Sequence, residues 1–208
     1  PPEDLLLRPA FLAACEEQLV RIAAALVALP GLHVVVGHPR ERAGGVARER
    51  SWSLPPCLNV ASVLAGGQVL ASYAKRELPN YQVFDERRYF YSGRDAGLGA
   101  VVVDVKGTRV GLLICEDAWF EDPAAAAQAA GAELLCVINA SPFHIGKVEE
   151  REARMAERAR AAGLPLVYAH LVGGQDEMVF DGASFAVQAD GTLAARAPMF
   201  EEALAVLA

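Results

Sequence analysis

The sequence has 208 residues, of which 53% are hydrophobic and 22% are charged, and its formal net charge is −7. This length is enough for one sizeable hydrophobic core, and we expect a single domain over residues 1–208. The acidic balance, without a run of Lys and Arg, argues against nucleic-acid binding, and no apolar run is long enough to span a membrane.

The four cysteines and four histidines are too scattered to indicate a disulfide framework or a metal site. No C-x-x-C pair occurs, and the histidines lack the spacing of metal ligands. We therefore expect reduced thiols, no bound metal and a cytoplasmic protein.

The first half of the sequence predicts one long helix followed by strands. Apolar residues recur at helical spacing until Pro30-Gly31, and later apolar runs flank Gly66-Gly67 as in a β-hairpin. The expected helix is 6–29, and the expected strands are 32–37, 58–64 and 68–74. Residues 39–56 are expected to form a long loop, whose role the sequence leaves open. Residues 76–90 mix aromatic and charged side chains, which suits either a pocket wall or a partly buried loop.

The second half alternates strands with helices. The expected strands are 100–105, 109–114, 134–139, 165–171, 182–189 and 193–197, and the expected helices are 123–130 and 147–162. We expect a turn over residues 173–177, and we expect the Glu and Arg residues of the helix 147–162 to face solvent. This alternation predicts an α/β sandwich with helices outside and sheets inside.

The stretch 109–119 places a cysteine at the end of a buried strand and just before a helix. The apolar run 110–114 ends abruptly at Cys115, and Gly111 lets a neighbouring element approach closely. Many α/β enzymes carry a nucleophile at such a place, because backbone N–H groups and a helix N-terminus stabilise an anion and lower the pKa of a thiol. On this stretch alone, a small buried structural cysteine is the stronger interpretation.

A catalytic Cys115 would need a partner that activates the thiol and donors that stabilise an oxyanion. Lys75, at the end of the strand 68–74, offers a positive charge and one donor, and the backbone N–H of Glu116 offers another. Glu86 and Glu116 are candidates for the general base, but neither spacing is compelling, and Asp117 is expected to cap the following turn. No Walker A, G-x-G-x-x-G or G-x-S-x-G motif is present.

Four segments together resemble the glutaminase domain of glutamine-dependent NAD synthetase, within the nitrilase (carbon–nitrogen hydrolase) superfamily. They are KRELPNYQVFDERRYF, GLLICEDAWF, NASPFHIGKVEERE and LVGGQDEMVFDGASF, which begin at residues 75, 111, 139 and 171. The resemblance covers nearly the whole chain. It implies a nitrilase-like α-β-β-α sandwich and a homo-oligomer.

The resemblance also implies a reaction, in which Cys115 attacks the side-chain amide of L-glutamine, ammonia leaves, and water hydrolyses the γ-glutamyl thioester. Lys75 is similar to the catalytic lysine, Glu86 to the glutamate that supports it, and the Glu116 N–H to an oxyanion donor. The residues similar to substrate-binding or pocket-lining positions are Tyr81, Ser141, Lys147 and Trp119. For Ser141 the alternative is a turn cap, and for Lys147 it is a surface charge at a helix start.

The sequence departs from the family pattern at its beginning. The family's general-base glutamate lies in an F-P-E type segment just before Y-P-P-E-D-L, whereas this sequence begins at Pro1-Pro2-Glu3-Asp4-Leu5. We therefore expect a sandwich that lacks the first strands and helix, and negligible glutaminase activity from this polypeptide alone. No S-G-G-x-D-S type loop follows Phe200, so ATP and Mg would belong to a synthetase domain outside this sequence, and this domain itself would need no cofactor.

Two other interpretations stay open. One is a free-standing carbon–nitrogen hydrolase that acts on another amide or a nitrile. The other is a non-catalytic assembly module, kept for subunit contacts.

Overall fold

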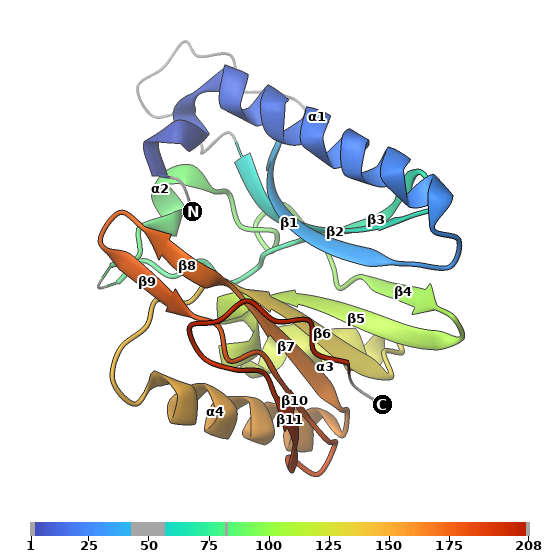
Figure 1. Cartoon of the computed structure of the whole chain (residues 1–208), viewed down its shortest axis with the longest axis vertical. Helices are drawn as coiled ribbons and strands as arrows, with labels where there is room; N and C mark the ends of the chain where they lie inside the picture. Colours follow the sequence, from blue (N-terminus) through green and yellow to red (C-terminus); the bar gives the residue numbers. More distant parts are fainter. Residues whose placement is uncertain (1–2, 43–56, 82, 207–208) are drawn as a thin grey trace. The chain divides into compact units, whose positions relative to one another are not determined.

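The computed structural model describes residues 3–42, 57–81 and 83–206 of the chain. Within these ranges the chain forms two compact units, Pro1–Lys106 and Gly107–Ala208 (Figure 1). Among the described residues, none of the helices combines the length and the apolar character that a membrane crossing requires.

The first unit is built on an antiparallel sheet of order β1-β2-β3. Its elements are η1 (Glu3–Leu7), α1 (Pro9–Ala25), η2 (Leu26–Ala28), β1 (Val34–Glu41), β2 (Cys57–Ala65), β3 (Gln68–Ala74), α2 (Glu86–Tyr89) and β4 (Val102–Val105). The long helix α1 lies over this sheet, as Figure 1 shows, and the contact is an apolar cluster. The buried members of that cluster are Leu19, Ala23, Leu26 and Leu64.

The expected helix over 6–29 is therefore three elements. Pro9 occupies the first turn of α1, where its missing N–H costs nothing, and Arg8 before it is extended with φ −98°. The hairpin of β2 and β3 is confirmed, whereas β1 runs to Glu41, so the start of the expected loop 39–56 is strand. Residues 43–56 of that loop lie outside the described residues.

The second unit is an α/β layer pair. Its elements are β5 (Thr108–Ile114), η3 (Cys115–Trp119), α3 (Glu121–Ala129), β6 (Leu134–Asn139), α4 (Lys147–Ala162), β7 (Leu166–His170), β8 (Val172–Gln175), β9 (Met178–Asp181), β10 (Phe185–Val187) and β11 (Leu193–Arg196). Within the unit the sheet order is β11-β10-β7-β6-β5; β5, β6 and β7 are parallel, and β8 pairs only with β9.

Helices α3 and α4 are neighbours in this unit, because Gln128 Nε2 of α3 donates a hydrogen bond to Ala162 O of α4 at 2.7 Å. The close approach of α3 explains Gly111 on β5. A Cβ at Gly111 would stand 3.0 Å from the Cβ atoms of both Ala127 and Ala132. The sequence-based expectation that Gly111 admits a close neighbour is confirmed.

The expected turn over residues 173–177 is wrong in part. Residues up to Gln175 belong to strand β8, and only Asp176 and Glu177 turn before β9. Asp176 has φ +53°, a conformation that Asp adopts more readily than most residues. Two consecutive glycines suggested a turn, but pairing with β9 keeps this segment extended.

Candidate active site

Three polar residues of the second unit lie at the carboxyl ends of its parallel strands. Cys115 follows β5, Ser141 lies two residues after β6, and His170 ends β7. Because β5, β6 and β7 run parallel, their carboxyl ends meet at the same edge, which is where α/β sheets usually bind ligands.

Cys115 is the first residue after β5, and its backbone has φ +47°. A non-glycine residue in this left-handed region carries strain, and such strain concentrates at functional positions. The turn is tied back to the strand, because Ile114 N donates to Asp117 Oδ2 at 3.1 Å and the Asp117 side chain is buried. The expectation that Asp117 caps this turn is confirmed. Cys115 itself is half-buried, so a small reagent has access to the thiol.

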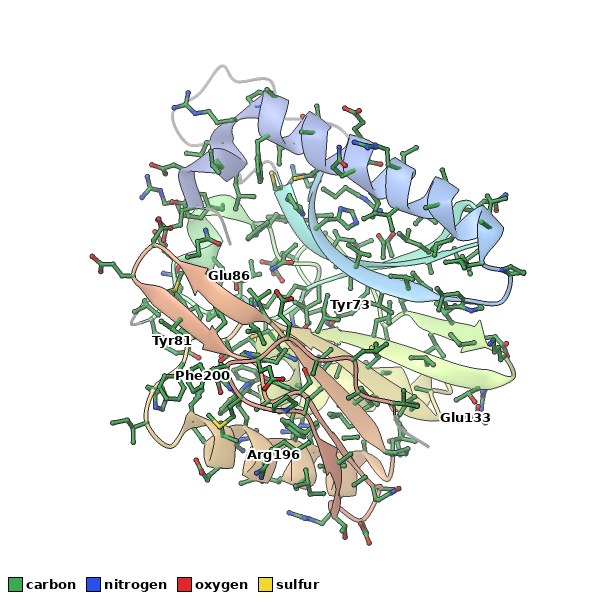
Figure 2. All side chains as sticks on the ribbon, viewed as in Figure 1. Tyr73, Tyr81, Glu86, Glu133, Arg196 and Phe200 are labelled. Carbon is green, nitrogen blue, oxygen red and sulfur yellow. The ribbon has the colours of Figure 1, made fainter. Side chains whose placement is uncertain are left out.

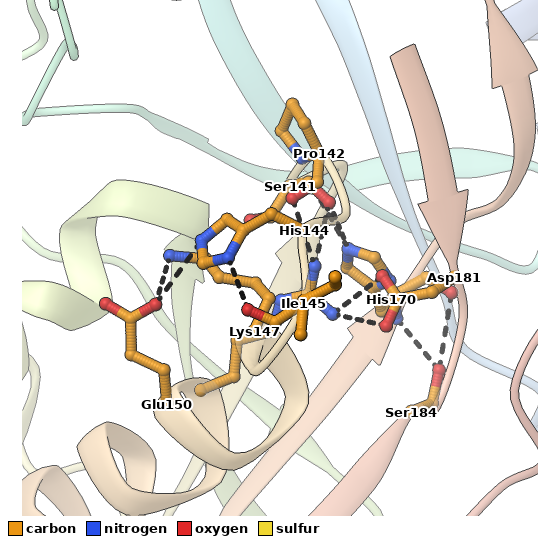
Figure 3. A network of polar contacts seen from close by, with 10 residues as sticks. Ser141, Pro142, His144, Ile145, Lys147, Glu150, His170, Asp181 and Ser184 are labelled. Atoms are coloured by element: carbon orange, nitrogen blue, oxygen red, sulfur yellow. Dashed lines mark hydrogen bonds and ion pairs between the residues drawn. The ribbon is translucent and has the colours of Figure 1, made fainter. Parts of the chain in front are cut away.

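Trp119 links this turn to the start of α4. The Lys147 Nζ lies 4.3 Å from the centre of the Trp119 ring. The same Nζ donates to Glu150 Oε2 at 2.9 Å (Figure 3). The Lys147 side chain is only 16% exposed, so it is not the solvated surface charge that the alternative interpretation required. A cation held against an aromatic face suits the binding of an anionic group.

Two buried arginines of α4 contact the loops at this edge. Arg151 donates to the carbonyls of Ser141 at 3.0 Å and Pro142 at 3.4 Å, while Arg158 donates to those of Ala118 at 3.2 Å and Trp119 at 3.4 Å. The expectation that all arginines of this helix face solvent is therefore wrong.

A sequence signal for these arginines exists. The buried positions of α4 are Val148, Arg151, Met155, Arg158, Ala159 and Ala162. Steps of three and four residues connect them, so Arg151 and Arg158 occupy the apolar stripe of the helix, and a charged residue in such a stripe indicates a buried partner.

The partners of Arg151 are Asp181 and His170. The Arg151 Nη1 donates to both carboxylate oxygens of Asp181 at 2.8 Å, and both side chains are buried. His170 Nε2 lies 3.1 Å from the backbone N and 3.0 Å from the backbone O of Ser141, and its Nδ1 lies 4.0 Å from Asp181 Oδ1. Figure 3 shows His170 and Asp181 beside the Ser141–Pro142 segment.

Burial, and then the positive charge of Arg151, lower the pKa of His170 to about 4. His170 is therefore neutral at pH 7. Its Nε2 lies beside the N–H and the carbonyl of Ser141, and it accepts from the first or donates to the second according to the ring tautomer. The neighbouring Tyr168 has its pKa raised well above 10, chiefly by burial.

Stability is expected to fall as the pH drops from 6.5 towards 4. In that window the unfolded chain binds a proton at His170 and the folded chain does not, which costs about 3 kcal/mol for a pKa lowered from 6.5 to about 4. Urea unfolding of the 208-residue chain at several pH values measures this loss. The variant His170→Gln should show a shallower dependence on pH, whereas the control His33→Gln, outside the network, should keep the slope.

In the first unit, Lys75 and Glu86 form a buried ion pair. The Lys75 Nζ donates to Glu86 Oε1 at 2.7 Å and to Oε2 at 2.9 Å, and both side chains are buried. Lys75 directly follows β3, and its backbone N donates to Asn59 O at 2.8 Å. Gly93 packs against Ala74, the residue before Lys75, because a Cβ at Gly93 would stand 2.5 Å from Ala74 O.

Glu86 reaches Lys75 because the single helical turn α2 is anchored at both ends. Glu86 N donates to Pro79 O at 3.2 Å, and Phe90 N donates to Glu86 O at 2.8 Å. An apolar cluster holds the turn in place; its buried members are Leu6, Cys57, Leu78, Tyr89 and Phe90. The described residues of the segment 76–90 therefore form a partly buried loop with one helical turn.

Tyr81, in the same loop, is 50% exposed and makes an edge-to-face contact with Phe84 at 5.7 Å between ring centres (Figure 2). The structure thus brings Lys75 and Glu86 together in the first unit. It brings Cys115, Glu116, Trp119, Ser141 and Lys147 to one edge of the second. Within the described ranges, no group of three or more His, Cys, Asp or Glu side chains could hold a metal ion.

The carbon–nitrogen hydrolase family matches residues 11–208 of the chain. The chain belongs to this family. The family resemblance drawn from the four sequence segments is thereby confirmed, and so is the nitrilase-like α/β fold class.

Individual relatives of this chain are more specific than the family as a whole. The chain is 52% identical over 200 residues to the glutamine-dependent NAD(+) synthetase of Xanthomonas campestris, covering 96% of the chain but 33% of that relative. The chain also resembles the structure of the glutamine-dependent NAD+ synthetase of Acinetobacter baumannii in complex with ADP, with a TM-score of 0.82 and 34% identity. This match covers 98% of this chain and 35% of the synthetase chain. In these relatives the matching part thus sits within a much larger enzyme.

A third relative bears on the cysteine. A variant amidase from Nesterenkonia sp. AN1, with a TM-score of 0.73 and 25% identity, shows covalent addition of the acetamide moiety of fluoroacetamide at its active site cysteine. That match covers 95% of this chain and 68% of the amidase.

Proposed function

We propose that this chain is the ammonia-supplying glutaminase part of a glutamine-dependent NAD synthetase. The observation that carries the proposal is the half-buried Cys115, held in a left-handed turn at the carboxyl edge of a parallel sheet. The synthetase names of the relatives support it, as does the covalent chemistry at the cysteine of the Nesterenkonia amidase.

The proposed reaction has two stages. A general base takes the proton of the Cys115 thiol, and the thiolate attacks the amide carbon of glutamine. The C–N bond breaks, and the nitrogen leaves as ammonia with the proton that the base returns. This gives a γ-glutamyl thioester, and water then attacks it to release glutamate and the thiol. The backbone N–H of Glu116 is proposed to stabilise the oxyanion of each tetrahedral intermediate.

The substrate is proposed to bind through the loop before α4. Lys147 supplies a positive charge for the α-carboxylate of glutamine, and its contact with Trp119 holds that charge in place. Ser141 contributes a hydroxyl, and the resemblance adds Tyr81. Lys75 and Glu86 are proposed as the catalytic lysine and its supporting glutamate on the resemblance and on their buried ion pair.

The ammonia is proposed to serve a synthetase domain, which would use ATP and Mg to form NAD from its deamido precursor. A homo-oligomer and a cytoplasmic location are proposed on the family resemblance and on the four free, scattered cysteines. The 208-residue polypeptide alone is proposed to release little ammonia, since its sequence contains no Phe-Pro-Glu segment of the kind that carries the family's general base.

A substrate panel tests the proposal. The complete gene product that carries this chain is supplied in turn with L-glutamine, L-asparagine and short aliphatic amides, and ammonia release is measured. A clear preference for glutamine is expected. Turnover of short amides without glutamine would instead indicate a free-standing amidase, and no turnover of any amide would indicate an assembly module.

A further inference from the structure

The backbone of Ser141 is held at both of its hydrogen-bonding groups. Its N–H donates to His170 Nε2 at 3.1 Å, and its carbonyl accepts from Arg151 Nη2 at 3.0 Å. These contacts use main-chain atoms of Ser141, so they fix where the buried residue lies without using its hydroxyl.

The arginine is itself fixed from the opposite side. Asp181 accepts from Arg151 Nη1 with both carboxylate oxygens at 2.8 Å, so the guanidinium plane is set by a buried charge pair. The other nitrogen of the same plane, Nη2, then points at the carbonyls of Ser141 and Pro142. Because a guanidinium is rigid, movement of the Asp181 carboxylate moves these two contacts as well.

His170 is joined to the same group from β7. Its backbone N donates to Ser184 Oγ at 2.9 Å, which fixes the residue at the strand end. Its Nδ1 is buried without a hydrogen-bond partner among the described residues and faces Asp181 Oδ1 at 4.0 Å.

We propose that Arg151, Asp181 and His170 are positioning residues for substrate binding, which hold the Ser141 segment in the conformation that accepts glutamine. This inference rests on the proposed function. It assigns a defined effect on the affinity for glutamine to three buried residues that are not themselves proposed to contact the substrate.

The position of Arg158 supplies the comparison. It is a second buried arginine on the same face of α4, but it contacts the carbonyls of Ala118 and Trp119 and not the Ser141 segment. A substitution at Arg158 therefore disturbs the packing of α4 to a similar degree while leaving the hold on Ser141 intact. Arg160, which is exposed near the opposite end of the same helix, serves as the neutral control.

The kinetic experiment uses the complete gene product and the variants Arg151→Lys, Asp181→Asn, Arg158→Lys and Arg160→Lys. We expect Arg151→Lys and Asp181→Asn to raise KM for glutamine about 10-fold or more, because a charge-assisted hydrogen bond is lost, while kcat changes less. Alkylation of Cys115 by iodoacetamide, which does not need the Ser141 segment, should proceed at the unaltered rate. A KM unchanged by both variants, or raised equally by Arg160→Lys, would overturn the inference while the proposed function stands.

A second measurement does not depend on turnover. Hydrogen exchange followed by mass spectrometry on peptides that contain Ser141 reports whether its amide is protected. Arg151→Lys and Asp181→Asn should expose this amide to exchange, and Arg158→Lys should leave it protected. If the wild-type protein does not hydrolyse glutamine, the proposed function fails. If the Ser141 amide keeps its protection in both variants, the positioning role fails on its own.

Discussion

Replacing Cys115 by alanine is expected to abolish the release of ammonia from glutamine by the complete gene product. Removal of a nucleophile lowers turnover by a factor on the order of 10³ to 10⁶, because what remains is substrate binding and the oxyanion donors. Alanine is the suitable replacement, because it keeps the left-handed backbone strain of the residue unchanged. Glycine would relieve that strain and alter stability as well.

The measurement combines ammonia release with mass spectrometry of acid-quenched protein. The unsubstituted protein should carry the mass of one γ-glutamyl group on the peptide that contains Cys115, and Cys115→Ala should not. Cys136→Ala is the matched control, because burial raises the pKa of the Cys136 thiol to about 11 and keeps it protonated at neutral pH. Full turnover by Cys115→Ala, or an adduct on Cys136, would contradict the assignment.

The elements that sequence reasoning placed best are those that local patterns determine. Strand β6 has the bounds expected from its apolar run, and α4 has those expected from its amphipathic period and from Gly146 and Gly163, which flank it with φ +81° and +62°. Strand β8 was missed because its glycines give no local reason to be extended. Its pairing with β9 supplies that reason.

The candidate site likewise contains residues that the sequence could place and contacts that only the fold creates. Cys115 could be placed at a strand end from sequence because it marks the abrupt end of an apolar run, whereas Lys147 became a candidate through the family resemblance. The contacts that fix Ser141 could not be predicted from sequence, because they join residues on α4, β7 and β9 that only the fold brings together. No spacing in the sequence connects Arg151 with Asp181, which lies 30 residues further along the chain.

Replacing Glu86 by glutamine should lower the free energy of unfolding of the 208-residue chain by about 3–5 kcal/mol, which is the usual cost of removing one partner from a buried ion pair. The change removes the negative charge that balances the Lys75 ammonium and leaves one amide oxygen as an acceptor. The Lys75 side chain is 1% exposed, so its ammonium cannot reach bulk water. Urea unfolding measures the loss. Glu157→Gln is the control, because Glu157 and Arg154 form an exposed pair, worth about 0–1 kcal/mol.

The double variant Lys75→Met/Glu86→Gln separates stability from catalysis. In the single variant Glu86→Gln the buried Lys75 ammonium has lost its counter-charge. In the double variant this ammonium is gone as well, so the double variant should recover much of the stability that Glu86→Gln loses. In the complete gene product it should still fail to hydrolyse glutamine, because the proposed catalytic lysine is absent. Recovery of both stability and turnover would show that the pair serves only the fold of the first unit. Recovery of stability alone is the result that the proposed role of Lys75 requires.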